Sequence, residues 1–111
     1  MGWFYREIRW GYFVVRDVEE PLHDVKITKD GLIITVDLPG ARKEDLVLNV
    51  SEDAIYIEAV SQVGGARVRY KKLIRTPMRI DPDRVEARLS NGILCILAPP
   101  KEVTFRKVKV E

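Results

Sequence analysis

Apolar and polar side chains alternate at every second position along short runs of this chain, from Val25 to Ala98. Leu32, Ile34 and Val36 form the clearest example. Successive side chains of a β-strand point to opposite faces, so this spacing places the apolar side chains on one face of a sheet. An amphipathic helix needs a period of about 3.6 residues, and no segment shows one convincingly. The chain is therefore predicted to be all-β.

Turn-forming residues separate the predicted strands. Pro39-Gly40 stops one strand, because proline has no N–H group for a ladder and glycine tolerates a positive φ. Asn91-Gly92 is the dipeptide most typical of a two-residue hairpin. Residues 41–45 are predicted to be a charged connection. Residues 10–15 could form a strand and residues 1–9 a short helix or a loose segment, and the pattern leaves both open. The predicted strands cover residues 25–27, 32–38, 46–50, 55–59, 68–78, 85–89 and 93–98.

Seven or eight short strands with frequent turns are typical of an antiparallel two-sheet sandwich of immunoglobulin-like architecture. A five-stranded barrel of the OB type is the alternative. With 111 residues the chain holds one such domain. We divide it into an N-terminal arm (1–21), a sandwich domain (22–101) and a C-terminal extension (102–111).

The composition argues against most catalytic chemistry. Cys95 is the only cysteine and His23 the only histidine, which excludes an internal disulfide, a Cys-rich zinc site and a two-histidine metal site. Cys95 lies between apolar neighbours and is predicted to be a buried, inert thiol, whereas His23 is predicted at the surface. We expect no enzyme, no cofactor and no metal.

The location of the protein is predicted from what the chain lacks. No apolar run approaches the about 20 residues that a membrane span needs, so we expect a soluble, cytoplasmic protein.

Asn49, Asn91 and Gln62 are the only side-chain amides, while charged residues make up 32%. Such a composition favours a heat-adapted source.

The first 13 residues contain most of the aromatic side chains. Such side chains bury large areas in many geometries, which suits an assembly or client-binding segment, although they could instead cover an open edge of the sandwich. The aromatic residues of this arm are Trp3, Phe4, Tyr5, Trp10, Tyr12 and Phe13.

Three sequence stretches resemble the alpha-crystallin domain of the small heat-shock proteins. The sequence VDLPG at 36–40, followed by KEDL at 43–46, is similar to the family's strand, Pro-Gly turn and acidic connection. ARLSNGIL at 87–94 matches its signature of Ala, three variable positions, Asn-Gly and a branched apolar residue before Leu. VKV at 108–110 resembles the family's Ile-x-Ile/Val tail motif. The chain looks like a short, archaeal or thermophilic member with an alpha-crystallin-type sandwich.

The resemblance implies an ATP-independent holdase that binds unfolding client proteins and assembles with itself. Val108 and Val110, two apart, would fill apolar pockets of a neighbouring subunit while the tail pairs along a sheet edge. The residues carried over as the tail-accepting groove are Leu46, Leu48, Val50, Val85, Ala87 and Leu89.

The chain departs from the family between Ile57 and Tyr70, where most members resemble one another in a longer loop that exchanges a strand between subunits. Here a continuous strand over 66–75, paired with its own copy, fits the length better. The candidate residues of this dimer edge are Arg67, Arg69, Lys71 and Lys72.

Two other functions remain open. A related sandwich could serve as a co-chaperone adaptor, like the CS-domain proteins that dock on a larger chaperone, and would then need no Val-x-Val tail. Residues 67–79 carry six basic and no acidic side chains and could contact nucleic acid. That partner is not expected, because Tyr70 is the only aromatic platform in the segment. Charges on an edge strand also commonly block unwanted pairing or form ion pairs between subunits.

Overall fold

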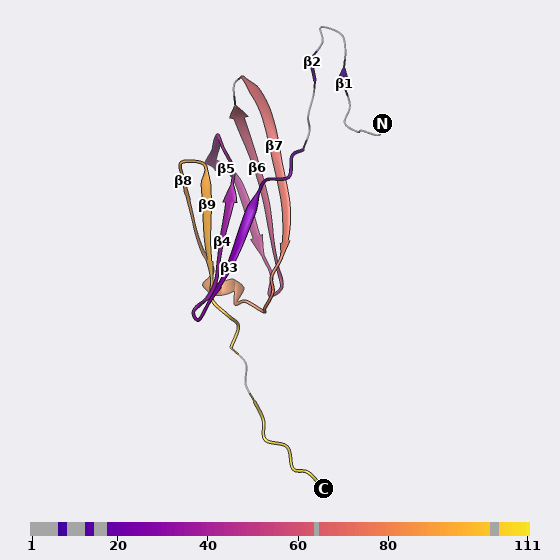
Figure 1. The fold of residues 1–111 in the computed structure, drawn as a ribbon, viewed down its shortest axis with the longest axis vertical. Coiled ribbons are helices and arrows are strands. Elements are labelled where there is room, and N and C mark those ends of the chain that lie inside the picture. The colour runs from indigo at the N-terminus through magenta and orange to yellow at the C-terminus, as the bar shows by residue number, and fades with distance from the viewer. Residues whose placement is uncertain (1–6, 9–12, 15–17, 64, 103–104) are drawn as a thin grey trace.

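The computed structural model describes residues 7–8, 13–14, 18–63, 65–102 and 105–111 (Figure 1). Nearly all regular structure in these ranges is β-strand, and the single turn of 3-10 helix η2 (Pro82–Arg84) is the only helical segment among them. The strands are β1 (Glu7–Ile8), β2 (Phe13–Val14), β3 (His23–Thr28), β4 (Gly31–Asp37), β5 (Ala41–Val50), β6 (Ala54–Val63), β7 (Ala66–Arg75), β8 (Glu86–Ser90) and β9 (Ile93–Ala98).

Two antiparallel sheets stack to form the body of the molecule (Figure 1). One has the order β3-β4-β9-β8 and the other the order β5-β6-β7. The short strands β1 and β2 pair with each other in the N-terminal arm. The predicted two-sheet sandwich is confirmed, and the alternative of a five-stranded barrel is wrong.

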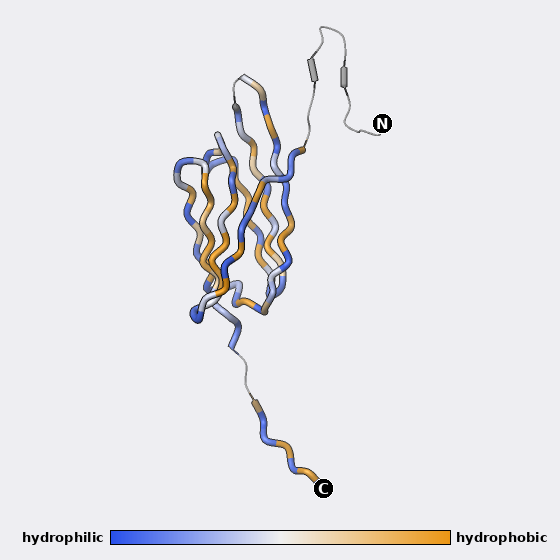
Figure 2. The backbone as a smooth tube through the Cα atoms, in the orientation of Figure 1, coloured by the Kyte–Doolittle hydropathy of each residue, from blue (hydrophilic) through white to orange (hydrophobic). Residues whose placement is uncertain are grey.

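The core lies between the sheets and consists of the side chains that the alternation points inward. Ile34, Ile57 and Ile96 have no exposed surface. Burying a side chain of this size contributes about 1.5–3 kcal/mol. Figure 2 shows the alternation as changes between hydrophobic and hydrophilic residues along each strand. The buried hydrophobic residues are Leu32, Ile34, Val36, Leu38, Ile55, Ile57, Ala59, Tyr70, Ile74, Ile80, Leu94, Ile96 and Ala98.

Two turns fix the pairing of the four-stranded sheet. Asn91 and Gly92 have φ values of 50° and 77°, and two successive positive values are typical of the predicted hairpin turn. Gly31 begins β4 with a φ of 124°, and a Cβ atom there would lie 2.3 Å from the carbonyl oxygen of Ala98. Only glycine therefore allows the β3–β4 turn to pass this close to the end of β9.

The prediction of a charged connection over 41–45 is wrong. The strand β5 already begins at Ala41, which pairs with Ser61, and its register shifts before Leu46 pairs with Ala59. A β-bulge adds residues to one strand without ending it, and it breaks the alternation that sequence reasoning relies on. In the bulged stretch Arg42 donates two hydrogen bonds to Asp45, at 3.1 and 2.9 Å, and this contact raises the pKa of Arg42.

Residues 18–20, here called the strap, connect one sheet to the other. The N–H of Glu19 donates to the carbonyl oxygen of Arg69 at 2.7 Å, and the N–H of Lys71 donates to the carbonyl oxygen of Glu19 at 3.1 Å. The chain then enters β3, so the edges of β3 and β7 share one side of the sandwich, the β3/β7 side (Figure 1). The edges of β5 and β8 share the opposite side, the β5/β8 side.

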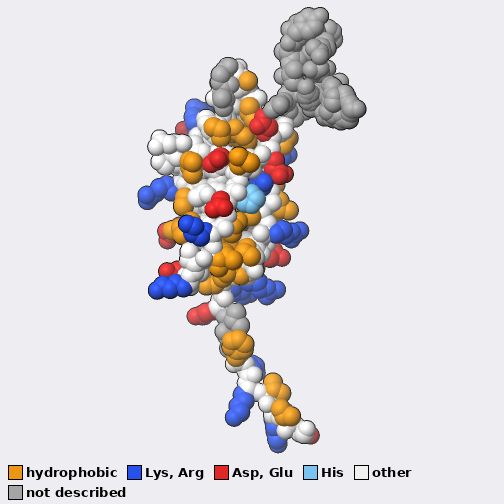
Figure 3. Space-filling model, viewed as in Figure 1, with side chains coloured by type: hydrophobic (Ala, Val, Ile, Leu, Met, Phe, Trp, Pro, Cys, Tyr) orange, Lys and Arg blue, Asp and Glu red, His pale blue; other side chains and the backbone are white. Residues whose placement is uncertain are grey.

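The outer face of the four-stranded sheet carries an apolar strip. Ile93 and Leu97 of β9 are 43% and 45% exposed, and Cys95 between them is half-buried. Figure 3 shows hydrophobic side chains on this face, with charged side chains between them and at its borders. The prediction of a buried Cys95 is wrong, because Leu94 and Ile96 both point into the core and direct the residue between them outward.

Candidate functional site

The residues predicted as the tail-accepting groove lie together on the β5/β8 side. On β5 they pair with Ala59, Ile57 and Ile55, which are buried, so their side chains point inward from a sheet edge. The residues next to and on β8 point inward in the same way. All but Ala87 are half-buried and pack partly against the core, and Ala87 is exposed. These residues are Leu46, Leu48, Val50, Val85, Ala87 and Leu89.

The edges of β5 and β8 have no neighbouring strand among the described residues, since each strand stands last in its sheet. Their outward-facing main-chain groups are therefore free to pair with an additional strand. An extended segment with apolar side chains two residues apart would match the spacing of Leu46, Leu48 and Val50. The β5/β8 side thus combines unpaired backbone with apolar contacts.

The tail extends away from the sandwich (Figure 1). Val108 and Val110 are 76% and 88% exposed, and Phe105 is 90% exposed. The described tail residues 105–111 form no strand. The two valines predicted as the assembly motif are thus presented to solvent.

The root of the tail is fixed by backbone hydrogen bonds. The N–H of Asp81 donates to the carbonyl oxygen of Pro99 at 2.9 Å. The N–H of Lys101 donates to the carbonyl oxygen of Arg79 at 3.0 Å. Lys101 also forms an ion pair with Glu52. Pro99 has no N–H group, so β9 ends at Ala98.

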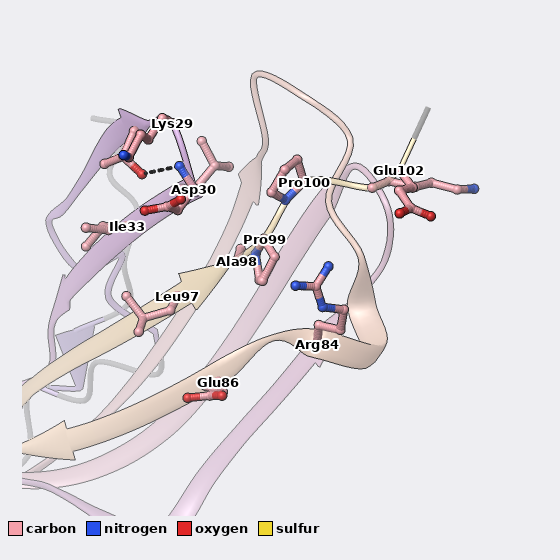
Figure 4. Close-up of a pocket in the computed structure, with 13 residues that line it drawn as sticks. Lys29, Asp30, Ile33, Arg84, Glu86, Leu97, Ala98, Pro99, Pro100 and Glu102 are labelled. Carbon is pink, nitrogen blue, oxygen red and sulfur yellow. Dashed lines mark hydrogen bonds between the residues drawn. The ribbon is translucent and has the colours of Figure 1, made fainter. Parts of the chain in front are cut away.

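A cavity of about 700 Å³ opens beside this root, between the β3–β4 turn and η2 (Figure 4). Its apolar part comes from Ile33, Leu97 and the two prolines. Charges of both signs surround it, so it shows no preference for an anion or a cation. The charged residues are Lys29, Arg84, Lys101, Asp30, Glu86 and Glu102. None of the six predicted groove residues lines this cavity.

The residues predicted as a dimer edge do not share one direction. Arg67, Arg69 and Lys71 lie opposite Gln62, Val60 and Glu58 of β6, and the strap holds the main chain at Arg69 and Lys71. Lys72 pairs with the buried Ile57 and points inward, with only 13% of its side chain exposed. It forms an ion pair with Glu20 at 3.1 Å.

Two tyrosines of the second sheet have raised pKa values. The hydroxyl of Tyr56 donates to Glu58 at 2.9 Å, and this hydrogen bond is the main reason for its raised pKa. Burial raises the pKa of Tyr70, which is 5% exposed, and the nearby Glu19 carboxylate adds to the effect. A hydrogen bond with Ser61 acts in the opposite direction.

The remaining predictions concern His23, metal binding, membrane spans and the aromatic arm. His23 lies exposed at the start of β3, as predicted. Within the described ranges no three metal-ligating side chains form a cluster, and no helix is long and apolar enough to cross a membrane. The arm residues Trp3, Phe4, Tyr5, Trp10 and Tyr12 lie outside the described residues, and for Phe13 only the backbone is described.

The family follows from comparison with known proteins. The sequence model of the Hsp20/alpha crystallin family matches residues 24–111, which include both sheets of the sandwich and the tail. The chain belongs to this family. The resemblance inferred from the VDLPG, ARLSNGIL and VKV stretches is therefore confirmed, and the sandwich is an alpha-crystallin domain.

Relatives of this chain are small heat shock proteins. It is similar to heat shock protein 16 of Schizosaccharomyces pombe, with 31% identity over 104 residues that cover 81% of this chain and 73% of the relative. A mitochondrial heat shock 22 kDa protein of Glycine max is 31% identical over 97 residues, and this chain spans 46% of its length. These relationships support a chaperone role for the chain.

Solved structures of the family share the fold. Heat shock protein 16.0 from Schizosaccharomyces pombe matches with a TM-score of 0.69 and 27% identity, covering 84% of this chain and 76% of that one. HspA from Xanthomonas axonopodis matches with a TM-score of 0.67 and 18% identity, covering 75% and 95%. The second likeness concerns the fold alone.

Sequence reasoning missed the strap. A signal was present in β7, where the inward positions Val68, Tyr70 and Ile74 are interrupted by Lys72. A lysine at an inward position of an edge strand needs a partner or a path to water. That requirement points to an acidic segment covering this edge, which Glu20 supplies.

Proposed function

We propose that this protein is an ATP-independent holdase that binds unfolding proteins and assembles through its C-terminal tail, acting in the cytoplasm. The family relationship supports the chaperone part. One observation carries the assembly part. Inward apolar side chains line the β5/β8 side, along which the described residues place no further strand, while Val108 and Val110 are exposed on an extended tail.

The mechanism follows from strand addition. The tail of one subunit would lie along β5 or β8 of another and exchange backbone hydrogen bonds with that edge. Val108 and Val110 lie two apart, so in an extended tail both side chains face the apolar residues of the edge. Lys107 and Lys109 would then face solvent.

The aromatic arm is proposed to bind clients. Its six aromatic side chains can contact many apolar surfaces without requiring one partner shape. The adaptor alternative predicts a monomer without holdase activity, and no observation favours it. The basic segment does not offer one continuous outward surface, because Lys72 points inward and binds Glu20.

The holdase proposal is tested by light scattering of a heat-aggregating client, with stoichiometric protein and without nucleotide. We expect suppression by the intact chain and loss of suppression when residues 1–13 are deleted. Absence of suppression at every ratio would overturn the holdase proposal and favour the adaptor.

The assembly proposal is tested separately with the V108A/V110A double variant. We expect a smaller assembly by light scattering after size-exclusion chromatography, with the domain still folded. The matched control K107A/K109A changes the other face of the tail and should leave the mass unchanged. A mass of V108A/V110A equal to that of the parent would remove the tail from the mechanism.

A further inference from the structure

The strap occupies the middle of the free edge of β7. Its two backbone hydrogen bonds use the carbonyl group of Arg69 and the N–H group of Lys71. Main-chain groups of a strand point alternately to its two neighbours, so residues 67, 69, 71, 73 and 75 direct theirs away from β6. The strap therefore holds part of this row.

Pro21 ends the strap. In a parallel ladder the residue two positions after Glu19 would be the next to bond with β7, by donating its N–H to the carbonyl oxygen of Lys71. Proline has no N–H group, and the chain turns instead into β3. Among the described residues, no backbone carbonyl outside the sheet accepts a hydrogen bond from the outward N–H of Leu73, whose side chain is 54% exposed.

Side chains fasten the strap over the β3/β7 side. Glu20 accepts a hydrogen bond from the inward-pointing Lys72 at 3.1 Å. The Glu20 side chain is itself 72% exposed, so water competes for this ion pair. The attachment thus includes two backbone hydrogen bonds and one largely solvated ion pair.

We propose that the strap is an intramolecular cover that competes with a second copy of this chain for the edge of β7. This inference rests on the proposed self-assembly. Two β7 strands that pair antiparallel would use the same groups of Arg69 and Lys71 that the strap holds, so both contacts cannot exist at once. Release of the strap would open a continuous edge from Arg67 to Arg75.

The competition makes pairing dependent on concentration. Each copy gives up the strap contacts once, whereas two paired edges gain a row of intermolecular hydrogen bonds. The closed form is favoured in dilute solution and the paired form at high concentration. Strap and tail act on opposite sides of the sandwich, so each can be tested without the other.

The test measures self-association in the V108A/V110A background, where the tail makes no contribution. The E19P variant removes the N–H that bonds to Arg69, and E20K replaces attraction to Lys72 by repulsion. We expect each variant to dimerise about tenfold more tightly in sedimentation equilibrium. The control E44K makes the same change of charge on β5, away from the strap, and should leave the dissociation constant unchanged.

A second substitution locates the new contact. L73P removes an outward N–H of β7 without removing a bond to β6, and an edge strand tolerates proline at such a position. Combined with E20K it should reverse the gain in association. In E20K alone, the Leu73 amide should become protected from hydrogen exchange as concentration rises.

The proposal is overturned if folded E20K associates no more tightly than its parent, or if L73P leaves a gain unchanged. E20K decides the question where E19P fails to fold. Holdase activity is not part of the readout, so its absence would contradict the proposed function without affecting this result.

Discussion

The two sides of the sandwich differ in what lies between their sheet edges. The β5/β8 side presents apolar inward side chains and has no strand along its edges within the described residues. The β3/β7 side carries an inward lysine and is crossed by the strap. An edge strand always exposes main-chain groups, so inward side chains and local cover decide which edge can accept a partner.

The largest effect should come from a change within the four-stranded sheet, because this sheet supplies β3 to one side of the sandwich and β8 to the other. We expect G31A to reduce the free energy of unfolding by about 2–4 kcal/mol, because the new Cβ meets backbone atoms of Ala98 and Pro99 at a positive φ. Urea unfolding measures this. G65A is the control, since a Cβ there meets nothing within 4 Å and adds only the cost of its φ of 82°. Equal losses for both variants would contradict the steric argument.

The next effect should appear when the β5/β8 side is given a charge like that of Lys72. We expect A87K to weaken tail-dependent association by about tenfold or more, because the tail would have to bury an ammonium group. The exposed position of Ala87 lets the domain fold. Mass against concentration is measured alongside S90K, a control on β8. A similar loss in S90K would show a general effect of charge.

A smaller effect is expected when the charge on the β3/β7 side is removed. K72M keeps the length of the side chain and breaks the ion pair with Glu20. We expect the free energy of unfolding to change by no more than about 1 kcal/mol, as for other solvated ion pairs. Hydrogen exchange of the Lys71 amide should become faster. A loss of several kcal/mol would mean that Lys72 supports the core rather than the strap.

The smallest effect concerns alkaline pH. The pKa of Tyr70 is raised in the folded chain, so the unfolded chain loses this proton first as pH rises past about 10. The contribution of Tyr70 to the free energy of unfolding is therefore fully present below that pH and is lost as the pH rises above it. Unfolding of the parent and Y70F between about pH 8 and 11 should show a shallower decline in Y70F. Parallel declines would contradict a role for Tyr70.

The periodic strands could be predicted from the sequence because each has one buried face. Leu32, Ile34 and Val36 alternate strictly and lie in the centre of a sheet. The start of β5 could not be predicted in this way, since the bulge between Ala41 and Leu46 breaks the period. Cys95 was misplaced because apolar neighbours suggest burial, although the alternation itself directs it outward.

The predicted groove residues were brought together by topology, which the family resemblance supplied and the alternation alone did not. The strap escaped prediction for a different reason. Its side-chain contact joins residues 52 positions apart, and nothing in the local pattern of residues 18–20 announces a bond to β7. Only the misplaced charge at Lys72 gave a hint.

The fixed root of the tail limits the symmetry of any assembly built with it. The tail leaves one end of the sandwich, whereas the surface proposed to accept it runs along the β5/β8 side. Donor and acceptor are thus different patches of the same subunit, and such a contact is heterologous. Repetition of one heterologous contact gives a ring where the rotation closes and an open filament where it does not. The direction in which the tail leaves Lys101 then determines which of the two forms, because it sets the angle between successive subunits.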